Sequence, residues 1–204
     1  MLLKLYAENT NPKDIRTVTE CLNDGGVIIY PTDTVYALGC SINSRTGIQR
    51  VANIKGVKAE KEDFSFVFYD LSHISEFTKQ FDSSVFKLLK KNLPGPFTFI
   101  LDANNSIAKL FKNKKKTLGI RIPDNKICSA ILEQQNAPII STSIHDEDEV
   151  IEYTTDPELL YEKYKNKVDI VIDGGYGHNE ASTIIDLTIG EPSIIRQGIG
   201  DLLI

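Results

Sequence analysis

Short apolar runs alternate with amphipathic segments along this 204-residue chain, and that alternation constrains its fold more than any other feature. Apolar side chains that recur at helical spacing predict helices at residues 12–24, 46–54, 83–92, 126–135 and 156–165. Strands are expected at residues 27–30, 64–69, 97–101, 117–122, 138–143, 169–172, 183–187 and 193–196. This order predicts an α/β domain built on a large twisted sheet. Several strands follow one another without a helix between them, so the sheet should be mixed.

Composition narrows the class of protein. The chain is 41% hydrophobic and 25% charged, and no repeat or linker divides it, which predicts one globular domain over residues 1–204. No run of 18 apolar residues is present, so no membrane span is expected. Cys21, Cys40 and Cys128 are too few and too widely spaced for a disulfide framework. A cytoplasmic protein is therefore expected.

The formal net charge of −5 argues against a protein that coats nucleic acid. The charge is uneven, however. Residues 109–121 hold six Lys or Arg and no acid, whereas residues 145–162 hold eight acids and no Lys or Arg. A basic patch could therefore face an anion. The acidic run 146–149 could bind a divalent cation, but a solvated loop is the more common role of such a run.

Several common active-site motifs are absent. The chain has no G-x-x-x-x-G-K-[ST] and no G-x-G-x-x-G after its first expected strand, which excludes a P-loop and leaves a dinucleotide site unsupported. It also lacks C-x-x-C and H-E-x-x-H, so a zinc site built by the protein is not expected.

Residues 25–39 (GGVIIYPTDTVYALG) form the most informative stretch. A buried strand should deliver Thr32, Asp33 and Thr34 into a loop at its carboxyl end, where ligands bind in open α/β sheets. The alternative is a polar turn in which Asp33 caps local N–H groups. Arg121 is a second candidate, because a charge inside an apolar strand needs a partner or a wet cavity.

Motifs spread along the chain resemble, in order, those of one family. They are residues 25–39, Lys55 after a short helix, 94–98 (P-G-x-x-T), 117–123 (T-x-x-x-R-x-P), 141–143 (for S-A-N), 182–186 (S-T-x-x-D) and 196–198 (R-x-G). Together they resemble the YrdC/YciO/YwlC family, whose enzymatic members are threonylcarbamoyl-AMP synthases. The likeness is strongest to the YciO branch. It implies a single YrdC-like domain with a core over about residues 9–200, a concave basic cavity and no extra C-terminal domain.

The resemblance also implies an activity. Synthases of this family condense L-threonine, bicarbonate and ATP into threonylcarbamoyl-AMP and pyrophosphate, for the t6A modification of tRNA position 37. The implied catalytic residues are Lys55 and Arg121. The implied ATP-binding residues are Lys55, Lys58, Thr117, Ser143 and Arg196. The implied threonine-binding residues are Thr32, Arg121, Ser141 and Ser182. Mg²⁺ is expected to bridge the phosphates of ATP, with no metal site made by the protein alone.

Two departures from the synthase pattern leave alternatives open. Val57 stands where the synthases carry the arginine of K-x-R, with Lys58 as the nearest substitute, and His145 replaces the asparagine of S-x-N. Lysine is a point charge and does not fully replace the bidentate fork of arginine. One alternative is a carbamate-adenylating enzyme with another substrate acid. The other is a non-catalytic protein that binds double-stranded RNA or tRNA through the cavity and the basic run 112–116. Homodimer formation is also left open.

Overall fold

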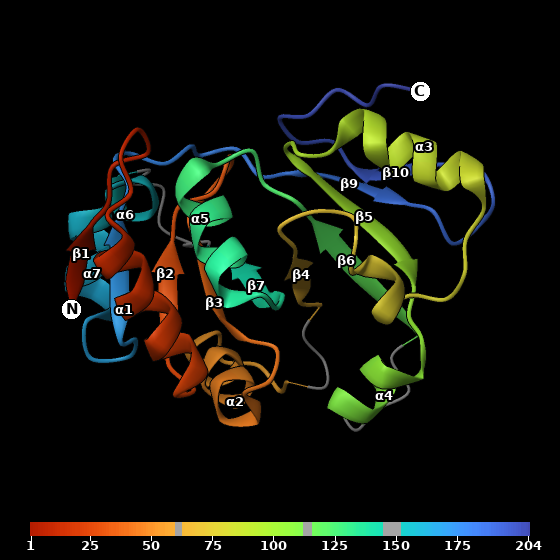
Figure 1. Cartoon of the computed structure of the whole chain (residues 1–204). Coiled ribbons are helices and arrows are strands. Elements are labelled where there is room, and N and C mark those ends of the chain that lie inside the picture. The colour runs from red at the N-terminus through yellow and green to blue at the C-terminus, as the bar shows by residue number, and fades with distance from the viewer. Residues whose placement is uncertain (60–62, 112–115, 145–151) are drawn as a thin grey trace.

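A ten-stranded mixed sheet organises the computed structural model, which describes residues 1–59, 63–111, 116–144 and 152–204 (Figure 1). The strands are β1 (Leu2–Lys4), β2 (Val27–Tyr30), β3 (Ala37–Ser41), β4 (Ser65–Val67), β5 (Phe97–Asp102), β6 (Thr117–Arg121), β7 (Ile139–Ser143), β8 (Ile170–Asp173), β9 (Thr183–Asp186) and β10 (Ser193–Arg196). Their order across the sheet is β1-β8-β2-β3-β7-β4-β6-β5-β9-β10. The sheet contains both parallel pairs, such as β4 with β6, and antiparallel pairs, such as β5 with β6.

Helices flank this sheet. They are α1 (Pro12–Asn23), α2 (Arg45–Ile54), α3 (Ser83–Asn92), α4 (Asn105–Phe111), α5 (Lys126–Gln135), α6 (Glu152–Thr155), α7 (Pro157–Tyr164) and the 3₁₀ turn η1 (Ile74–Glu76). Side-chain caps begin four of the described helices: Asn11, Ser44, Asn125 and Asp156 accept backbone N–H groups at the starts of α1, α2, α5 and α7. The helix α1 ends before Gly25, whose φ of +83° suits glycine.

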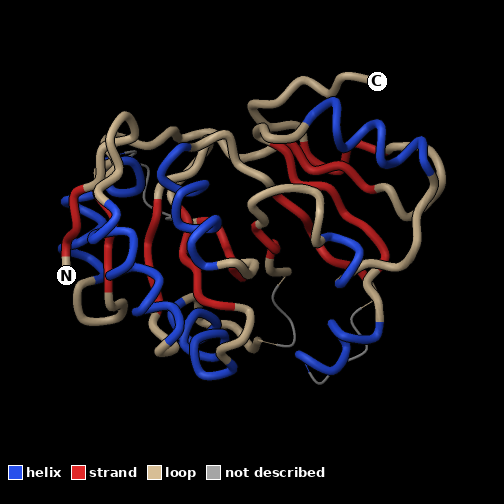
Figure 2. The backbone as a smooth tube through the Cα atoms, in the orientation of Figure 1, coloured by secondary structure: helices blue, strands red, loops and turns tan. Residues whose placement is uncertain are grey.

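The two faces of the sheet bury different helices. Alternate residues of β2 divide between two cores: Val27 and Ile29 join the core that contains α2, whereas Ile28 and Tyr30 join the core that contains α1 and α5. Helices α1 and α5 pack on one another over this second face (Figure 2). The candidate site described below lies further along that same face.

The expected fold class is confirmed, and several elements were predicted closely. Helices at residues 83–92 and 126–135 have the expected bounds. The expected strand at residues 64–69 is shorter, at Ser65–Val67. Five elements were missed, namely β1, β3, η1, α4 and α6. The sheet thus begins at Leu2, outside the expected core of residues 9–200, because β1 pairs with β8.

The strand β3 shows why a loop was expected there. Ala37, Gly39 and Ser41 are small residues with weak strand propensity. The segment becomes a strand because it pairs with β2 on one side and β7 on the other, and all five residues are buried. No helix in the described ranges is long and apolar enough to cross a membrane. The three cysteines are free thiols.

Candidate ligand-binding cavity on the sheet

A cavity of about 470 Å³ opens over the central strands of the sheet. Its floor includes Ser65 of β4, Gly119 of β6 and Ile100 of β5, which lie side by side in the strand register. The same row continues through Ser141 of β7 to Gly39 of β3, where α1 and α5 cover the sheet. The lining residues are Lys55, Asp63, Phe64, Ser65, Thr98, Ile100, Thr117, Leu118, Gly119, Arg121, Thr142, Ser143, Ser182, Ile184, Ile195 and Arg196.

Arg121 is a buried charged residue on the cavity lining. Its side chain is 6% exposed, and Nη2 donates to Asp33 Oδ1 at 2.8 Å and to Thr34 Oγ1 at 3.0 Å. The other oxygen of Asp33 accepts the Asp124 N–H at 3.1 Å. The Nε of Arg121 is buried and has no acceptor among the residues that the structure describes, which is costly for a charged donor. The charge that seemed anomalous in an apolar strand therefore has both a partner and a cavity, and Asp33 holds a distant arginine as well as a backbone N–H.

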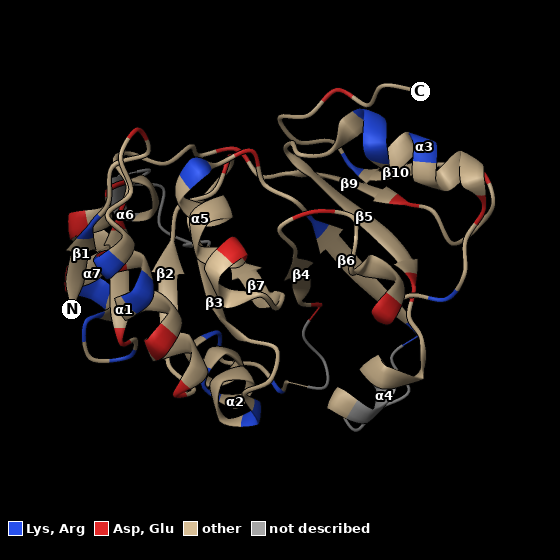
Figure 3. Ribbon diagram, viewed as in Figure 1, with Lys and Arg blue, Asp and Glu red and all other residues tan. Residues whose placement is uncertain are grey.

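Two further cations reach the cavity from other segments. Lys55 follows α2, and its Nζ donates to the Ser143 carbonyl at 3.1 Å. Arg196 ends β10 and donates from Nε and Nη2 to the Ser182 carbonyl, at 3.3 and 2.8 Å. Arg196 is exposed as a whole residue, but partial burial of its guanidinium and then the nearby charge of Arg121 lower its pKa. Asp63 is the one acidic residue on the described lining of the cavity. Basic residues are not confined to the cavity, because Lys and Arg also occur on α3 and α5 (Figure 3).

Hydroxyl groups supply the neutral polar surface. Thr117, Ser143 and Ser182 line the cavity, as expected of binding residues. The hydroxyls of Thr98 and Ser182 lie 2.8 Å apart, and both residues are buried. Thr98, Ser65 and Gly119 were not among the expected site residues. The alternation of faces along the predicted strands would have pointed to Gly119, which lies two residues from Arg121.

Three expected site residues are not on the described lining of the cavity. The Thr32 hydroxyl donates to the Val35 carbonyl at 2.7 Å, so it stabilises its own turn. Ser141 Oγ accepts the Tyr30 hydroxyl at 2.8 Å, and Lys58 is exposed. Their expected roles in binding stay predictions. His145, the acidic run 146–149 and most of the basic run 112–116 lie outside the described residues.

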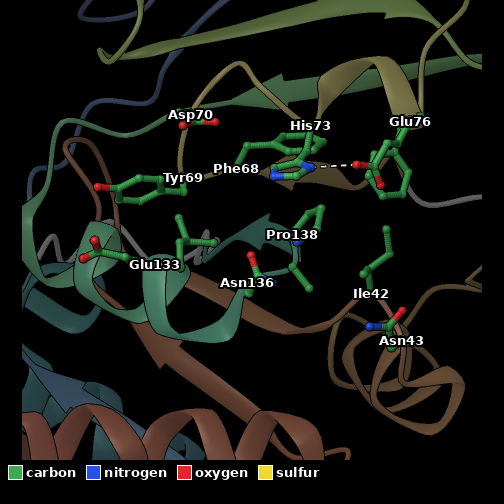
Figure 4. A pocket seen from close by; sticks show the side chains of 13 residues that line it. Ile42, Asn43, Phe68, Tyr69, Asp70, His73, Glu76, Glu133, Asn136 and Pro138 are labelled. Carbon is green, nitrogen blue, oxygen red and sulfur yellow. Dashed lines mark hydrogen bonds and ion pairs between the residues drawn. The ribbon is translucent and has the colours of Figure 1, made fainter.

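A second cavity, of about 410 Å³, lies at the opposite ends of β4 and β7 (Figure 4). Phe68 and Pro138 contribute to its walls, and Nδ1 of His73 lies 2.6 Å from Oε1 of Glu76. That hydrogen bond raises the pKa of His73. The described lining holds carboxylates but no Lys or Arg, and none of the expected site residues. The cavity with the expected residues is therefore the candidate site.

This chain is similar to known proteins in sequence and in fold. Residues 20–198 match the Sua5/YciO/YrdC family model, described as "Telomere recombination". The Escherichia coli protein YciO, named as uncharacterised, is 36% identical over 200 residues, which cover 97% of this chain and 95% of that protein. The crystal structure of E. coli YciO matches with a TM-score of 0.87 and 35% identity, over 98% of this chain and 97% of that one.

More distant relatives carry a named activity. The threonylcarbamoyl-AMP synthase of Coxiella burnetii is 27% identical over 180 residues, which cover 88% of this chain and 95% of that protein. The structure of P. abyssi Sua5 complexed with L-threonine matches with a TM-score of 0.84, over 97% of this chain and 57% of that one. At 22% identity this match shows a shared fold. Because the family model spans most of the sequence and YciO matches along nearly all of it, the chain belongs to the Sua5/YciO/YrdC family.

Proposed function

We propose that this chain is a nucleotidyltransferase that adenylates a carbamate, with ATP as the donor and L-threonine as the amino acid. One observation carries the proposal: Lys55, Arg121 and Arg196 come from three distant segments and line one cavity together with hydroxyl groups. Clustered cations suit a triphosphate and a carboxylate. The relatives support the same chemistry, since one is a threonylcarbamoyl-AMP synthase and another was solved with L-threonine.

The proposed reaction has two balanced steps. The amine of threonine attacks the carbon of bicarbonate, and loss of water gives a carbamate. A carbamate oxygen then attacks the α-phosphorus of ATP, the bond from that phosphorus to the β-phosphate oxygen breaks, and pyrophosphate leaves. Such transfers depend mainly on positioning and on neutralisation of phosphate charge. The product, threonylcarbamoyl-AMP, would serve the t6A modification of tRNA.

The cavity suggests how the work is divided. Arg121, held by Asp33, would bind the carboxylate of the amino acid or its carbamate. Arg196 stands near Arg121 and would neutralise the phosphates, with Lys55 at the Ser143 side of the cavity. Thr117 and Ser143 would donate to the nucleotide and Ser182 to threonine. For Thr32 to donate to threonine, its hydroxyl would have to leave the Val35 carbonyl, whereas the Ser141 hydroxyl accepts from Tyr30 and would donate its own hydrogen.

Magnesium fits this chain only as an ion carried by ATP. Within the described ranges no three His, Cys, Asp or Glu side chains gather as a metal site, and Asp63 alone contributes a carboxylate to the described lining. Mg²⁺ commonly keeps several waters and binds through substrate phosphates, so such a site needs few protein ligands. When bound, the ion would neutralise charge on the departing pyrophosphate.

Pyrophosphate release tests the proposal. The protein should release pyrophosphate from ATP only when both bicarbonate and threonine are present. Lys55→Ala should reduce the rate by about 10²–10³, the usual loss when one preorganised charge contact is removed. Lys87→Ala, an exposed lysine on α3, is the matched control and should leave the rate unchanged.

The other outcomes separate the alternatives. Normal ATP binding without threonine-dependent release, but with release in the presence of another amino acid, would assign a different substrate acid. Binding of tRNA that weakens steeply with salt, without ATP binding, would favour the non-catalytic protein. The tests with other amino acids and with tRNA matter because Val57 places an apolar, 37% exposed side chain where the synthases carry arginine.

A further inference from the structure

Gly119 is an unusual residue for its position. It lies in the middle of β6, paired with Ser65 of β4 and with Ile100 of β5, so it is inside the sheet rather than at an edge. The φ of Gly119 lies outside the positive, left-handed region, so its backbone conformation does not require glycine. Glycine weakens a strand interior and often marks a close approach by a ligand. A need for space above the strand would therefore explain the glycine at this position.

The space above Gly119 belongs to the cavity. A Cβ atom built there would meet Thr98 Cγ2 at 3.1 Å and Ser65 Oγ at 3.6 Å, and both of those residues line the cavity. Gly39 in the same row is different, because its Cβ would lie 2.8 Å from Ile139 Cγ2 and 2.9 Å from the Tyr30 ring, and neither residue lines the cavity. Of these two glycines, one makes room for the protein's own aromatic ring and the other makes room for the cavity.

Gly119 also lies between the charged ends of the site. Residues 117, 119 and 121 share one face of β6, so Gly119 separates Thr117 from Arg121, which are about 13 Å apart at strand rise. A ligand whose anionic groups contact both Arg121 and the Lys55 side must cross Gly119. We propose that Gly119 is a specificity-determining residue that lets the middle of an elongated, multiply anionic nucleotide lie directly against the backbone of β6. This inference rests on the proposed function, whose substrate class it specifies.

Substitutions at Gly119 give the direct test. Gly119→Ala and Gly119→Val should weaken ATP binding, measured by calorimetry, by about 10-fold to 200-fold, the range for a single added methylene in a pocket, with Val at the larger end. The Michaelis constant for ATP in pyrophosphate release should rise in parallel. The melting temperature of Gly119→Ala should stay the same or rise, because alanine suits a strand better than glycine. A purely structural glycine would move stability and affinity downward together.

Two further variants separate the loss of ligand space from strain and from lost stability. Gly119→Ala combined with Thr98→Ser deletes the methyl group that the new Cβ meets and keeps the hydroxyl that bonds to Ser182, so it should relieve any strain yet still bind ATP weakly. Ile120→Val, on the opposite face of β6, should lower the melting temperature and leave the affinity unchanged. Wild-type affinity in Gly119→Val, or no ATP binding by the wild type, would overturn the inference. ATP binding without pyrophosphate release would overturn the proposed reaction and leave the role of Gly119 measurable.

Discussion

Two arginine–aspartate ion pairs have the same length and different surroundings. Arg121 and Asp33 lie 2.8 Å apart beside the cavity, with side chains 6% and 8% exposed. Arg50 and Asp169 also lie 2.8 Å apart, but with side chains 40% and 41% exposed. The first pair joins β6 to the turn after β2, and the second joins α2 to the residue before β8.

Burial, rather than the distance between the charged atoms, decides what each ion pair contributes to the protein. Loss of one partner from a buried pair leaves an uncompensated charge away from water. An exposed pair gains little, because water screens both charges and two mobile side chains must be ordered. The buried pair therefore fixes the position of Arg121 at the cavity, whereas the exposed pair adds a small amount of stability at the surface.

The largest expected effect comes from Asp33→Ala. Arg121 would lose its carboxylate partner while it stays buried, so the free energy of unfolding should fall by about 3–5 kcal/mol. Urea denaturation measures this loss. Asp33→Asn keeps an oxygen acceptor for Arg121 and should lose less. If the free energy of unfolding of Asp33→Ala falls by less than about 1 kcal/mol, the pair behaves like an exposed ion pair, because water in the cavity screens its charges.

Arg196→Ala should separate activity from stability at the same cavity. In the described part of the protein, Arg196 donates to the Ser182 carbonyl, and the residue is exposed. Its loss should reduce pyrophosphate release by about 10²–10³. The free energy of unfolding should change by less than about 0.5 kcal/mol, as is usual for surface substitutions. Arg16→Ala, an exposed residue of α1, is the matched control, and equal effects of the two changes on the rate would contradict the assignment.

A smaller and pH-dependent effect is expected at the exposed pair. Burial alone would raise the pKa of Asp169, but hydrogen bonds from Arg50 and the Val27 N–H hold that pKa below its ordinary value. The ionised carboxylate therefore stabilises the fold above the ordinary aspartate pKa of about 3.9, and this stability is lost as the pH falls through the lower folded pKa.

The variant Asp169→Asn tests this expectation by urea denaturation at several pH values. At pH 7 it should lower the free energy of unfolding by no more than about 1 kcal/mol, and the difference from the wild type should shrink as the pH falls below about 4. If the difference in free energy of unfolding between Asp169→Asn and the wild type grows in acid, the expected direction of the pKa shift of Asp169 is wrong.

The smallest effects concern cysteine reactivity, and each ion pair has a nearby thiol. Burial raises the pKa of Cys21, close to Asp169 and Arg50, to about 11. Burial raises the pKa of Cys128, close to Arg121 and Asp33, to about 12. Because the thiolate is the reactive form, native alkylation at pH 8 should be slow at Cys21 and slower still at Cys128.

Mass spectrometry of the alkylated protein then compares the two pairs directly. Asp33→Ala should speed labelling of Cys128, because the weakened core opens more often, whereas Asp169→Asn should leave Cys128 protected. Fast labelling of Cys128 in the wild type would contradict the burial of that end of the cavity.

The sequence predicted most of the local elements, and six of the residues it proposed for the site lie on one cavity. The helix at residues 126–135 had the right bounds because its start is capped by Asn125 and its end by Asn136, both local signals. The strand β3 was missed because its strand conformation depends on pairing with β2 and β7. Lys55, Arg121 and Arg196 were grouped through the family resemblance, and the structure places them on one cavity.

Other site residues depended on information the sequence does not carry locally. The hydroxyl group of Thr32 closes a turn onto the Val35 carbonyl in this structure, and its expected role in binding threonine stays a prediction. Ser141 lies in the same strand row as Ser65 and Gly119, yet it accepts the Tyr30 hydroxyl. Which members of one row stay open to the cavity depends on which large side chain lies above each of them.

The sequence by itself determined the mixed α/β class, through hydrophobic periodicity, and the need of Arg121 for a partner, through the cost of burying a charge. Only the tertiary structure decided that this partner is Asp33, 88 residues away, and that Gly119 lines the cavity while Gly39 is covered by Ile139 and Tyr30. The physical reason is that burial and charge pairing arise between strands that are distant in the chain. The register between strands such as β4 and β6 sets them, and that register forms only when strands from distant parts of the chain pair.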